Sequence, residues 1–206
     1  MNSENKNDQK HQEKMAKQKA KVDAAIARAD KEQGVVIVLT GTGKGKSSSG
    51  FGTLLRSMGH GNKVGLVQFI KGNWGDGAVV GERAMFQEMP LMTHKMMGSG
   101  FTWETQDKSK DQEAFDHIWP QAKAMLQDES IHTVMFDELT YMLAYKLLAW
   151  EDLKEALESR PKMQNVIITG RGAPSALRDF ADTVTDMKSE KHAFQAGIKA
   201  QAGIEW

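Results

Sequence analysis

The chain has 206 residues, of which 40% are hydrophobic, and it is long enough for one domain with a sizeable core. Lys plus Arg and Asp plus Glu both number 27, so the net charge is zero, which argues against nucleic acid and membrane surfaces as partners. The chain has no cysteine, which excludes disulfides, zinc–thiolate sites and cysteine nucleophiles.

Residues 1–33 form a distinct, highly charged segment that we predict to be a helical extension. Helix propensity is high from about residue 10 to residue 32, but the larger apolar residues, Met15, Val22 and Ile26, make a stripe too thin to be buried in a core. Two interpretations stay open: a solvated or frayed tail, and a helix that becomes ordered only against a partner subunit or a bound ligand.

The sequence contains no segment typical of membrane insertion or secretion. No apolar run approaches the ~18 residues of a membrane span, and the N-terminal segment lacks the apolar core of a signal peptide. We therefore expect a soluble, cytoplasmic protein.

From Gly34 on, short apolar runs alternate with helical patterns, so we assign residues 34–206 to one nucleotide-binding domain. The alternation predicts an α/β fold with a mostly parallel sheet covered by helices on both faces. Strands are expected at 35–39, 63–70, 131–139 and 165–170, with a weaker one at 182–187 and a further candidate at 90–97. Helices are expected at 46–58, 108–128, 140–158 and 174–181, with Pro120 kinking or splitting the second.

The stretch VVIVLTGTGKGKSSSGFG joins the first predicted strand to the first predicted helix. It resembles the phosphate-binding pattern G-x-x-x-x-G-K-[ST], which ends here at Lys46 and Ser47, although Thr40 replaces the first glycine. Its glycines let backbone N–H groups turn toward phosphate oxygens, and the helix N-terminus adds positive charge. A flexible surface turn is the alternative. The predicted phosphate-contacting residues are Gly41, Thr42, Gly43, Lys44, Gly45, Lys46, Ser47 and Ser48.

A second motif, which is acidic, also supports a nucleotide site. The run VMFDEL places Asp137 and Glu138 at the C-terminal end of an apolar strand, where ligands bind in α/β sheets. These carboxylates, together with the hydroxyl of Ser47, are candidate Mg²⁺ ligands. The alternative is that one acid caps the helix expected near Thr140. The two motifs together predict a nucleoside triphosphate with a divalent cation, but they name no reaction.

Six motifs occur in an order that resembles one family. TGTGKGKSSS, VQFIKGNW, GFTWETQ, FDELTY, ITGRG and KHAFQAGIKAQAGIEW are similar to those of the P-loop type ATP:corrinoid adenosyltransferases, over about residues 34–206. The resemblance implies a RecA-like homodimer that transfers the 5′-deoxyadenosyl group of ATP to the cobalt of a cob(I) corrinoid and releases triphosphate. It leaves cob(I)alamin and a precursor such as cob(I)yrinic acid a,c-diamide both open as the substrate. It also implies Mg²⁺ or Mn²⁺ and a reduced, flavodoxin-like flavoprotein as electron donor.

The resemblance assigns roles to further residues. Phe101 and Trp103 would be catalytic, as aromatic side chains on a loop that keep an axial donor away from cobalt, and ordinary core residues are the alternative. Lys46 would be catalytic by neutralising the departing triphosphate. Arg171 would contact the polyphosphate or, alternatively, form a surface salt bridge. Residues 1–33 would form a helix over the corrinoid site of the neighbouring subunit.

Other functions and sites are less favoured by the sequence. A small P-loop kinase or ATPase is the alternative enzyme, and a RecA-like nucleic-acid-binding module is disfavoured by the neutral charge. We expect His60 to be structural at a helix end, Met96 and Met97 to fill the core, and we leave His192 open.

Overall fold

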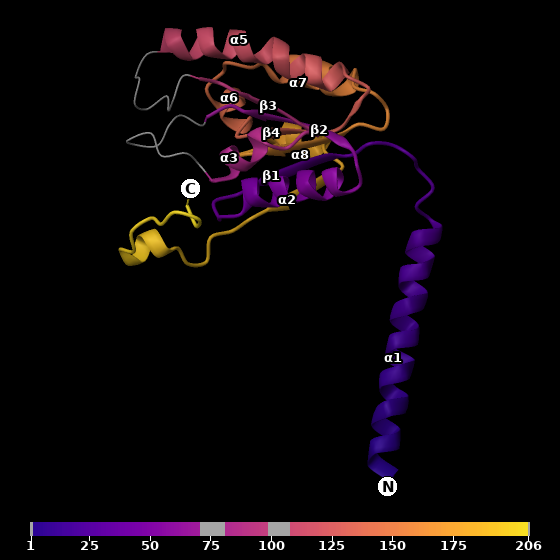
Figure 1. The fold of residues 1–206 in the computed structure, drawn as a ribbon. Coiled ribbons are helices and arrows are strands. Elements are labelled where there is room, and N and C mark those ends of the chain that lie inside the picture. The colour runs from indigo at the N-terminus through magenta and orange to yellow at the C-terminus, as the bar shows by residue number, and fades with distance from the viewer. Residues whose placement is uncertain (1, 71–80, 99–107, 206) are drawn as a thin grey trace. The chain divides into compact units, whose positions relative to one another are not determined.

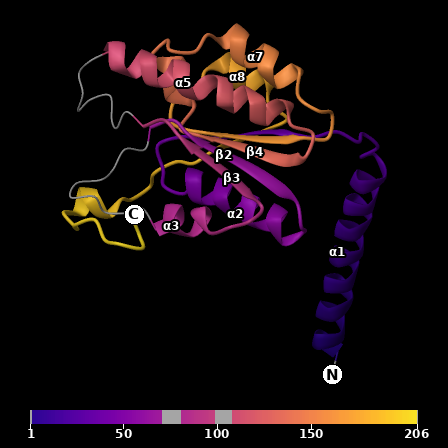
Figure 2. The same ribbon diagram turned by 45° about the horizontal axis from the view of Figure 1, so that its top comes forward.

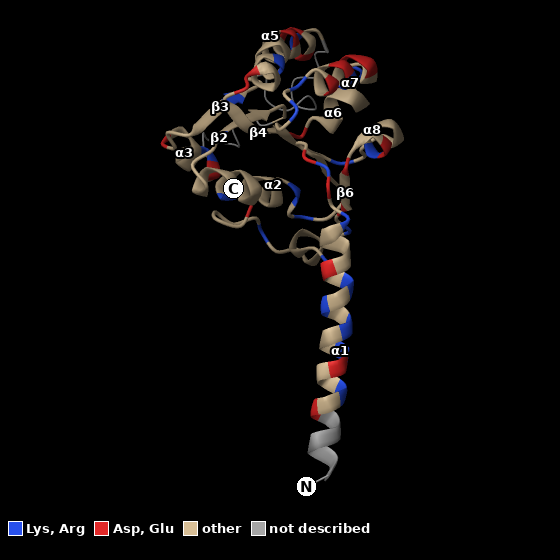
Figure 3. Ribbon diagram, turned by 90° about the vertical axis from the view of Figure 1, so that its right-hand side faces the viewer, with Lys and Arg blue, Asp and Glu red and all other residues tan. Residues whose placement is uncertain are grey.

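The computed structural model describes residues 2–70, 81–98 and 108–205, and the chain divides into two units, residues 1–33 and 34–206. The first unit is a single helix, α1 (Asn2–Ala27), which begins and ends earlier than the sequence pattern predicted. Figure 3 shows acidic and basic residues interspersed along it. In the described part of the chain, no helix combines the length and the apolar character that crossing a membrane requires.

The second unit is built on a six-stranded sheet in the order β3-β2-β4-β5-β1-β6, in which every pairing is parallel (Figure 1). This architecture confirms the predicted α/β fold and is consistent with a RecA-like P-loop fold. The two weakest strand candidates form the two edges of the sheet. The strands are β1 (Val36–Thr40), β2 (Lys63–Gln68), β3 (Met92–Met96), β4 (Ile131–Asp137), β5 (Asn165–Thr169) and β6 (Thr183–Asp186).

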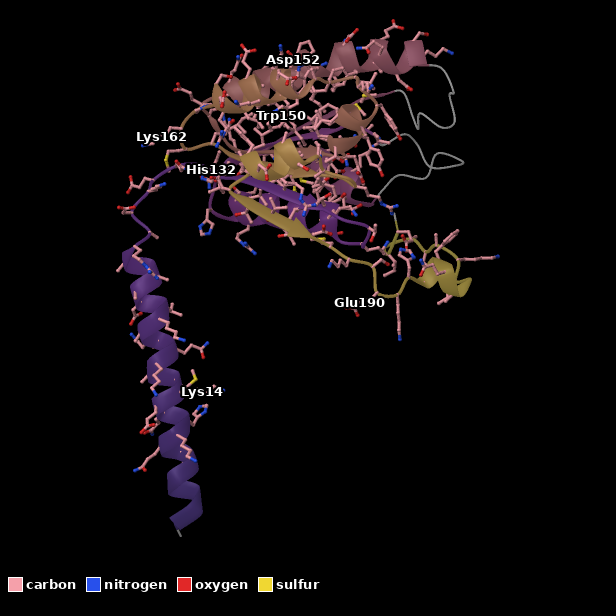
Figure 4. The ribbon with its side chains drawn as sticks, turned by 180° about the vertical axis from the view of Figure 1, so that it is seen from behind. Lys14, His132, Trp150, Asp152, Lys162 and Glu190 are labelled. Atoms are coloured by element: carbon pink, nitrogen blue, oxygen red, sulfur yellow. The ribbon has the colours of Figure 1, made fainter. Side chains whose placement is uncertain are left out.

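Helices cover both faces of this sheet, as predicted (Figure 2). Buried strand residues alternate between the two faces: Phe136 and Ile168 pack in one apolar cluster, whereas Met135 and Ile167 pack in the other. One face is covered by α2 (Lys46–Gly59) and α3 (Gly81–Gln87). The other is covered by α5 (Lys108–Gln127), α7 (Trp150–Glu158) and α8 (Ser175–Phe180). Trp150, at the start of α7, is labelled in Figure 4. Its ring packs edge-on against that of Phe180 in α8, with ring centroids 5.8 Å apart.

Two helix predictions differ in part from the structure. Of the two outcomes expected at Pro120, a kink or a split, the split is wrong, because α5 continues through this residue. Proline removes one backbone hydrogen bond there, but Trp119 and Ala122 on either side are buried against the sheet and hold the helix in place. The predicted helix over 140–158 is two helices, α6 (Thr140–Ala144) and α7, because the backbone at Lys146 is left-handed (φ 60°) and ends α6.

Candidate functional site

The predicted nucleotide-binding residues of the described chain come from consecutive strand ends at one edge of the sheet. β1 leads into the loop before α2, β4 ends at Asp137, and β5 leads into the loop that contains Arg171. β5 lies between β1 and β4, so the phosphate loop and the acidic pair are separated by one strand. Because all the strands are parallel, these ends lie at the same edge, where α/β sheets bind ligands.

The phosphate loop turns through two left-handed glycines. Gly41 has φ 101° and Gly45, the residue before α2, has φ 106°, which is a conformation that favours glycine. Helix α2 then begins at Lys46 and has no acidic residue in its first turn. The first N–H groups of a helix have no acceptor within it and carry partial positive charge. The loop therefore presents a helix N-terminus suited to an anion.

The loop is also held by the chain that follows β6, which the sequence analysis did not anticipate. The N–H of Met187 donates to Thr40 O at 2.8 Å, and the N–H of Gly43 donates to Met187 O at 2.7 Å. A Cβ atom on Gly41 would lie 2.4 Å from Met187 O. Glycine is thus required by close backbone packing, and the amide of Gly43 is engaged by the protein itself.

The two loop lysines have different environments. Lys46 is only 7% exposed, and its Nζ donates to Gly43 O at 2.7 Å. Burial lowers the pKa of Lys46, although the nearby Glu138 carboxylate opposes this shift. A polyphosphate would favour its charged form. Lys44 is instead half-exposed, and its ammonium pairs with the carboxylate of Glu205 near the C-terminus. Lys46 is therefore the buried cation at the start of α2, whereas Lys44 is engaged at the surface.

Asp137 lies at the centre of a buried hydrogen-bond network. Its side chain is fully buried, and its Oδ1 accepts bonds from Ser47 Oγ and Thr169 Oγ1, both at 2.7 Å. Its Oδ2 accepts a bond from Gln68 Nε2 at 3.0 Å. The Ser47 hydroxyl donates a hydrogen bond to Asp137. The lone pairs of Ser47 Oγ are therefore directed away from the carboxylate and can bind a cation. The sequence analysis identified Asp137 and Ser47 but missed Gln68 and Thr169.

Glu138 follows in a left-handed conformation (φ 63°) that turns the chain away from β4. Its backbone N–H donates to Thr169 Oγ1 at 3.0 Å, and the oxygen Oε2 of its side chain is buried. The capping alternative is wrong for the cap position of α6, which is Leu139 and not an acid. Neither acid is therefore the cap residue of α6.

Arg171 lies on the exposed loop after β5, in the same cluster of charges. The hydroxyl of Thr140 donates to Arg171 O at 2.7 Å and holds this loop against the start of α6. Burial raises the pKa of Tyr141, and Glu138 raises it further whereas Arg171 opposes the rise. Arg171 also contributes to the lowered pKa of Lys46. Two cations, Lys46 and Arg171, and one anion, Glu138, thus lie close enough to interact beside the phosphate loop.

The donor set at this site fits a hard divalent cation. Ser47, Asp137 and Glu138 offer only oxygen atoms, which Mg²⁺ and Mn²⁺ prefer. Among the described residues, no group of three or more His, Cys, Asp or Glu side chains is arranged to hold a metal. A divalent cation held by these residues would need further oxygen ligands, and nucleotide phosphates can offer them.

Several other predicted residues lie apart from this edge. Phe101 and Trp103 fall outside the described residues. His60 is the C-cap residue of α2, and His192 Nδ1 accepts a bond from Phe194 N at 3.2 Å at the start of a short 3₁₀ helix, so both have structural positions. Met97 is buried in the core, as predicted, whereas Met96 is only partly buried and its sulfur accepts a hydrogen bond from Arg83.

Known proteins match the chain over nearly its whole length. The family model described as ATP:corrinoid adenosyltransferase BtuR/CobO/CobP matches residues 32–206, and the one described as Cob(I)alamin adenosyltransferase N terminal matches residues 1–26. The corrinoid adenosyltransferase of Escherichia coli strain K12 is 46% identical over 199 residues, which are 97% of this chain and 99% of the relative. That of Pseudomonas aeruginosa is 46% identical over 207 residues, or 100% of both chains. That of a Sinorhizobium species is 40% identical over 204 residues, which are 98% of this chain and 94% of the relative.

Proposed function

We propose that this chain, which belongs to the ATP:corrinoid adenosyltransferase family, transfers the 5′-deoxyadenosyl group of ATP to the cobalt of a cob(I) corrinoid and releases triphosphate. The observation that carries the proposal is the buried Lys46 at the N-terminus of α2, beside the Ser47–Asp137 pair. This arrangement suits a polyphosphate that leaves with its charge neutralised. The acceptor is either cob(I)alamin or a precursor such as cob(I)yrinic acid a,c-diamide.

The proposed reaction requires no proton transfer by the protein. The electron pair of Co(I) forms the bond to C5′, and the C5′–O bond breaks with its electrons leaving on triphosphate. Because the nucleophile carries no proton, no general base is needed, and the protein contributes by orienting C5′ in line with cobalt. Lys46, Arg171 and the helix N-terminus stabilise the charge that grows on the leaving group.

A divalent cation would be held by Ser47, Asp137 and Glu138, and it would supply further charge neutralisation on the phosphates when bound. The network around Asp137 supports this role, because it fixes the Ser47 hydroxyl with its lone pairs directed away from the carboxylate. Mg²⁺ and Mn²⁺ both suit this set of oxygen ligands.

We further propose a homodimer in which α1 covers the corrinoid site of the neighbouring subunit, with a reduced, flavodoxin-like flavoprotein as electron donor. The match of residues 1–26 to the N-terminal family model supports a functional role for this helix. Its exposed Met15, Val22 and Ile26 offer a narrow apolar stripe for a partner surface.

The nature of the phosphorus product tests the proposed reaction. Purified protein given ATP, Mg²⁺ or Mn²⁺ and chemically reduced corrinoid should form a light-sensitive Co–C product and one inorganic triphosphate for each corrinoid alkylated. Light sensitivity is followed by absorbance, and the phosphorus species by ³¹P NMR. The control omits the corrinoid. Formation of ADP and phosphate without alkylated corrinoid would reject attack at C5′ and favour the kinase or ATPase alternative.

The aromatic pair is proposed to act before the transfer, by keeping an axial donor off Co(II) so that it becomes easier to reduce. Trp103→Ala should therefore slow adenosylation that starts from Co(II) and a reduced flavoprotein by about 10-fold or more. This loss corresponds to an increase of about 1.4 kcal/mol or more in the barrier. Adenosylation of chemically pre-formed Co(I) should change much less. An equal loss in the two assays would show that Trp103 acts in some other way.

A further inference from the structure

Polar side chains from four neighbouring strands form one continuous hydrogen-bonded chain, which runs from the middle of β3 to the carboxyl ends of β2, β4 and β5. His94 comes from β3, Gln68 from β2, Asp137 from β4 and Thr169 from β5, in the order in which these strands lie. The links are His94 Nε2 to Gln68 Oε1 at 3.0 Å, Gln68 Nε2 to Asp137 Oδ2 at 3.0 Å, and Thr169 Oγ1 to Asp137 Oδ1 at 2.7 Å. We call these four residues the edge chain.

The chemistry of each group fixes the direction of the bonds. An ionised Asp137 carboxylate only accepts hydrogen bonds, so the Gln68 amide must present its NH₂ group to it. The amide oxygen then faces His94, and His94 must carry a proton on Nε2 to donate to it. The His94 ring also lies edge-on against Phe86, with centroids 6.3 Å apart and planes at 79°, which restrains its orientation. His94 therefore orients the Gln68 amide, and the Gln68 amide in turn orients the Asp137 carboxylate.

The edge chain also lies beside the phosphate loop. Gln68 and Asp137 are register partners on adjacent strands, and Asp137 Oδ1 accepts the bond from Ser47 that directs the Ser47 lone pairs. Hydroxyl donors restrain one oxygen of the carboxylate, and Gln68 restrains the other. Without Gln68, the Asp137 carboxylate can rotate about its Cβ–Cγ bond, and the hydroxyl of Ser47 loses a fixed acceptor.

We propose that Gln68 and His94 are positioning residues that hold Asp137, and through it Ser47, in the geometry that binds the divalent cation of the ATP complex. This inference rests on the cation role in the proposed function. Gln68 is 4% exposed, and a buried amide is costly unless both of its ends are paired, as the ends of Gln68 are with Asp137 and His94. Outer-shell partners of this kind typically change metal affinity by about 10–100-fold.

The test measures the coupling between ATP and metal, without turnover. ATP is titrated by calorimetry into protein that lacks corrinoid, once with saturating Mn²⁺ and once with EDTA. The dissociation constant in EDTA divided by that in Mn²⁺ gives the gain in ATP affinity due to the metal. Gln68→Met should lower this ratio by about 10-fold, because it keeps the side-chain volume but removes the donor to Asp137. His94→Phe should also lower this ratio. His94→Gln should keep the wild-type ratio, because the glutamine amide can donate a hydrogen bond to Gln68.

Lys95→Gln, on the exposed face of the same strand, is the matched control and should leave the ratio unchanged. Thermal unfolding of each variant shows that it is folded, and the half-buried His94 on an edge strand makes its variants the safer pair. The electron paramagnetic resonance spectrum of bound Mn²⁺ should also change in His94→Phe and return in His94→Gln. Folded variants with the wild-type ratio and spectrum would overturn the inference. A wild-type protein without any metal-dependent gain would instead reject the cation site itself.

Discussion

Lys46→Met should lower kcat by about 10²–10³-fold while leaving the ligand-free protein at least as stable as the wild type. The side chain is 7% exposed, and burial lowers its pKa, which means that the folded protein disfavours the charged ammonium. Methionine has a similar length and needs no desolvated charge. The same substitution removes the cation that neutralises the departing triphosphate. We therefore expect activity and stability to change in different directions.

Lys44→Met is the matched control, because Lys44 lies in the same loop but is half-exposed and paired with Glu205. A screened surface pair contributes little, about 0–1 kcal/mol, so we expect less than about a 10-fold loss of kcat. Steady-state formation of the Co–C product and thermal unfolding of both variants make the comparison. Equal losses of kcat in the two variants would contradict the assignment of the leaving triphosphate to Lys46 and the N-terminus of α2. A strong destabilisation of Lys46→Met would show that the lysine is mainly structural.

The central strands and the phosphate loop could be predicted because their signals are local. β1, β4 and β5 are buried on both faces, so each reads as a continuous apolar run. The edge strands β3 and β6 are partly exposed, which is why their patterns were weak. The break at Lys146 depends on one left-handed residue in a segment that is otherwise helical in character, and no residue there signals it.

The edge chain could not be predicted, because it depends on register between strands that are distant in the sequence. Gln68 lies within the strand predicted at 63–70, and nothing in that pattern indicates a partner for its side chain. Its partners Asp137 and His94 lie 69 and 26 residues away, and only the strand order brings all three together. The packing of Met187 against the phosphate loop is hidden for the same reason. Motifs predict which residues contact a nucleotide, but they do not indicate the residues that hold those side chains in place.

Gly170→Ala should destabilise the protein by about 3–5 kcal/mol and lower Tm by about 6–20 °C. Gly170 is buried with φ 138°, which side chains with a Cβ rarely adopt, and its N–H donates to Leu39 O at 3.2 Å. A Cβ there would lie 2.0 Å from Thr140 Oγ1, so that side chain must move. Thr140 then loses its bond to Arg171 O, and we expect weaker ATP binding as well.

Gly172→Ala provides the control within the same loop. Gly172 also has a left-handed backbone (φ 64°), but a Cβ at this position would meet no atom within 4 Å among the described residues. Its substitution should cost only the backbone strain, about 1–2 kcal/mol. Thermal unfolding and ATP titration compare the two variants. Similar losses in both would show that the left-handed backbone accounts for the effect and that contact with Thr140 does not.

A double-mutant cycle separates the two causes at Gly170. In Gly170→Ala with Thr140→Ala the methyl group and the hydroxyl no longer collide, while the strained backbone remains. The double variant should be less destabilised than the sum of the single variants, by about 1–3 kcal/mol, because residues in contact are not additive. Strict additivity would mean that the loop moves as a whole to relieve the collision. In that case Arg171 is displaced together with its backbone, and the loss of ATP affinity should persist in the double variant.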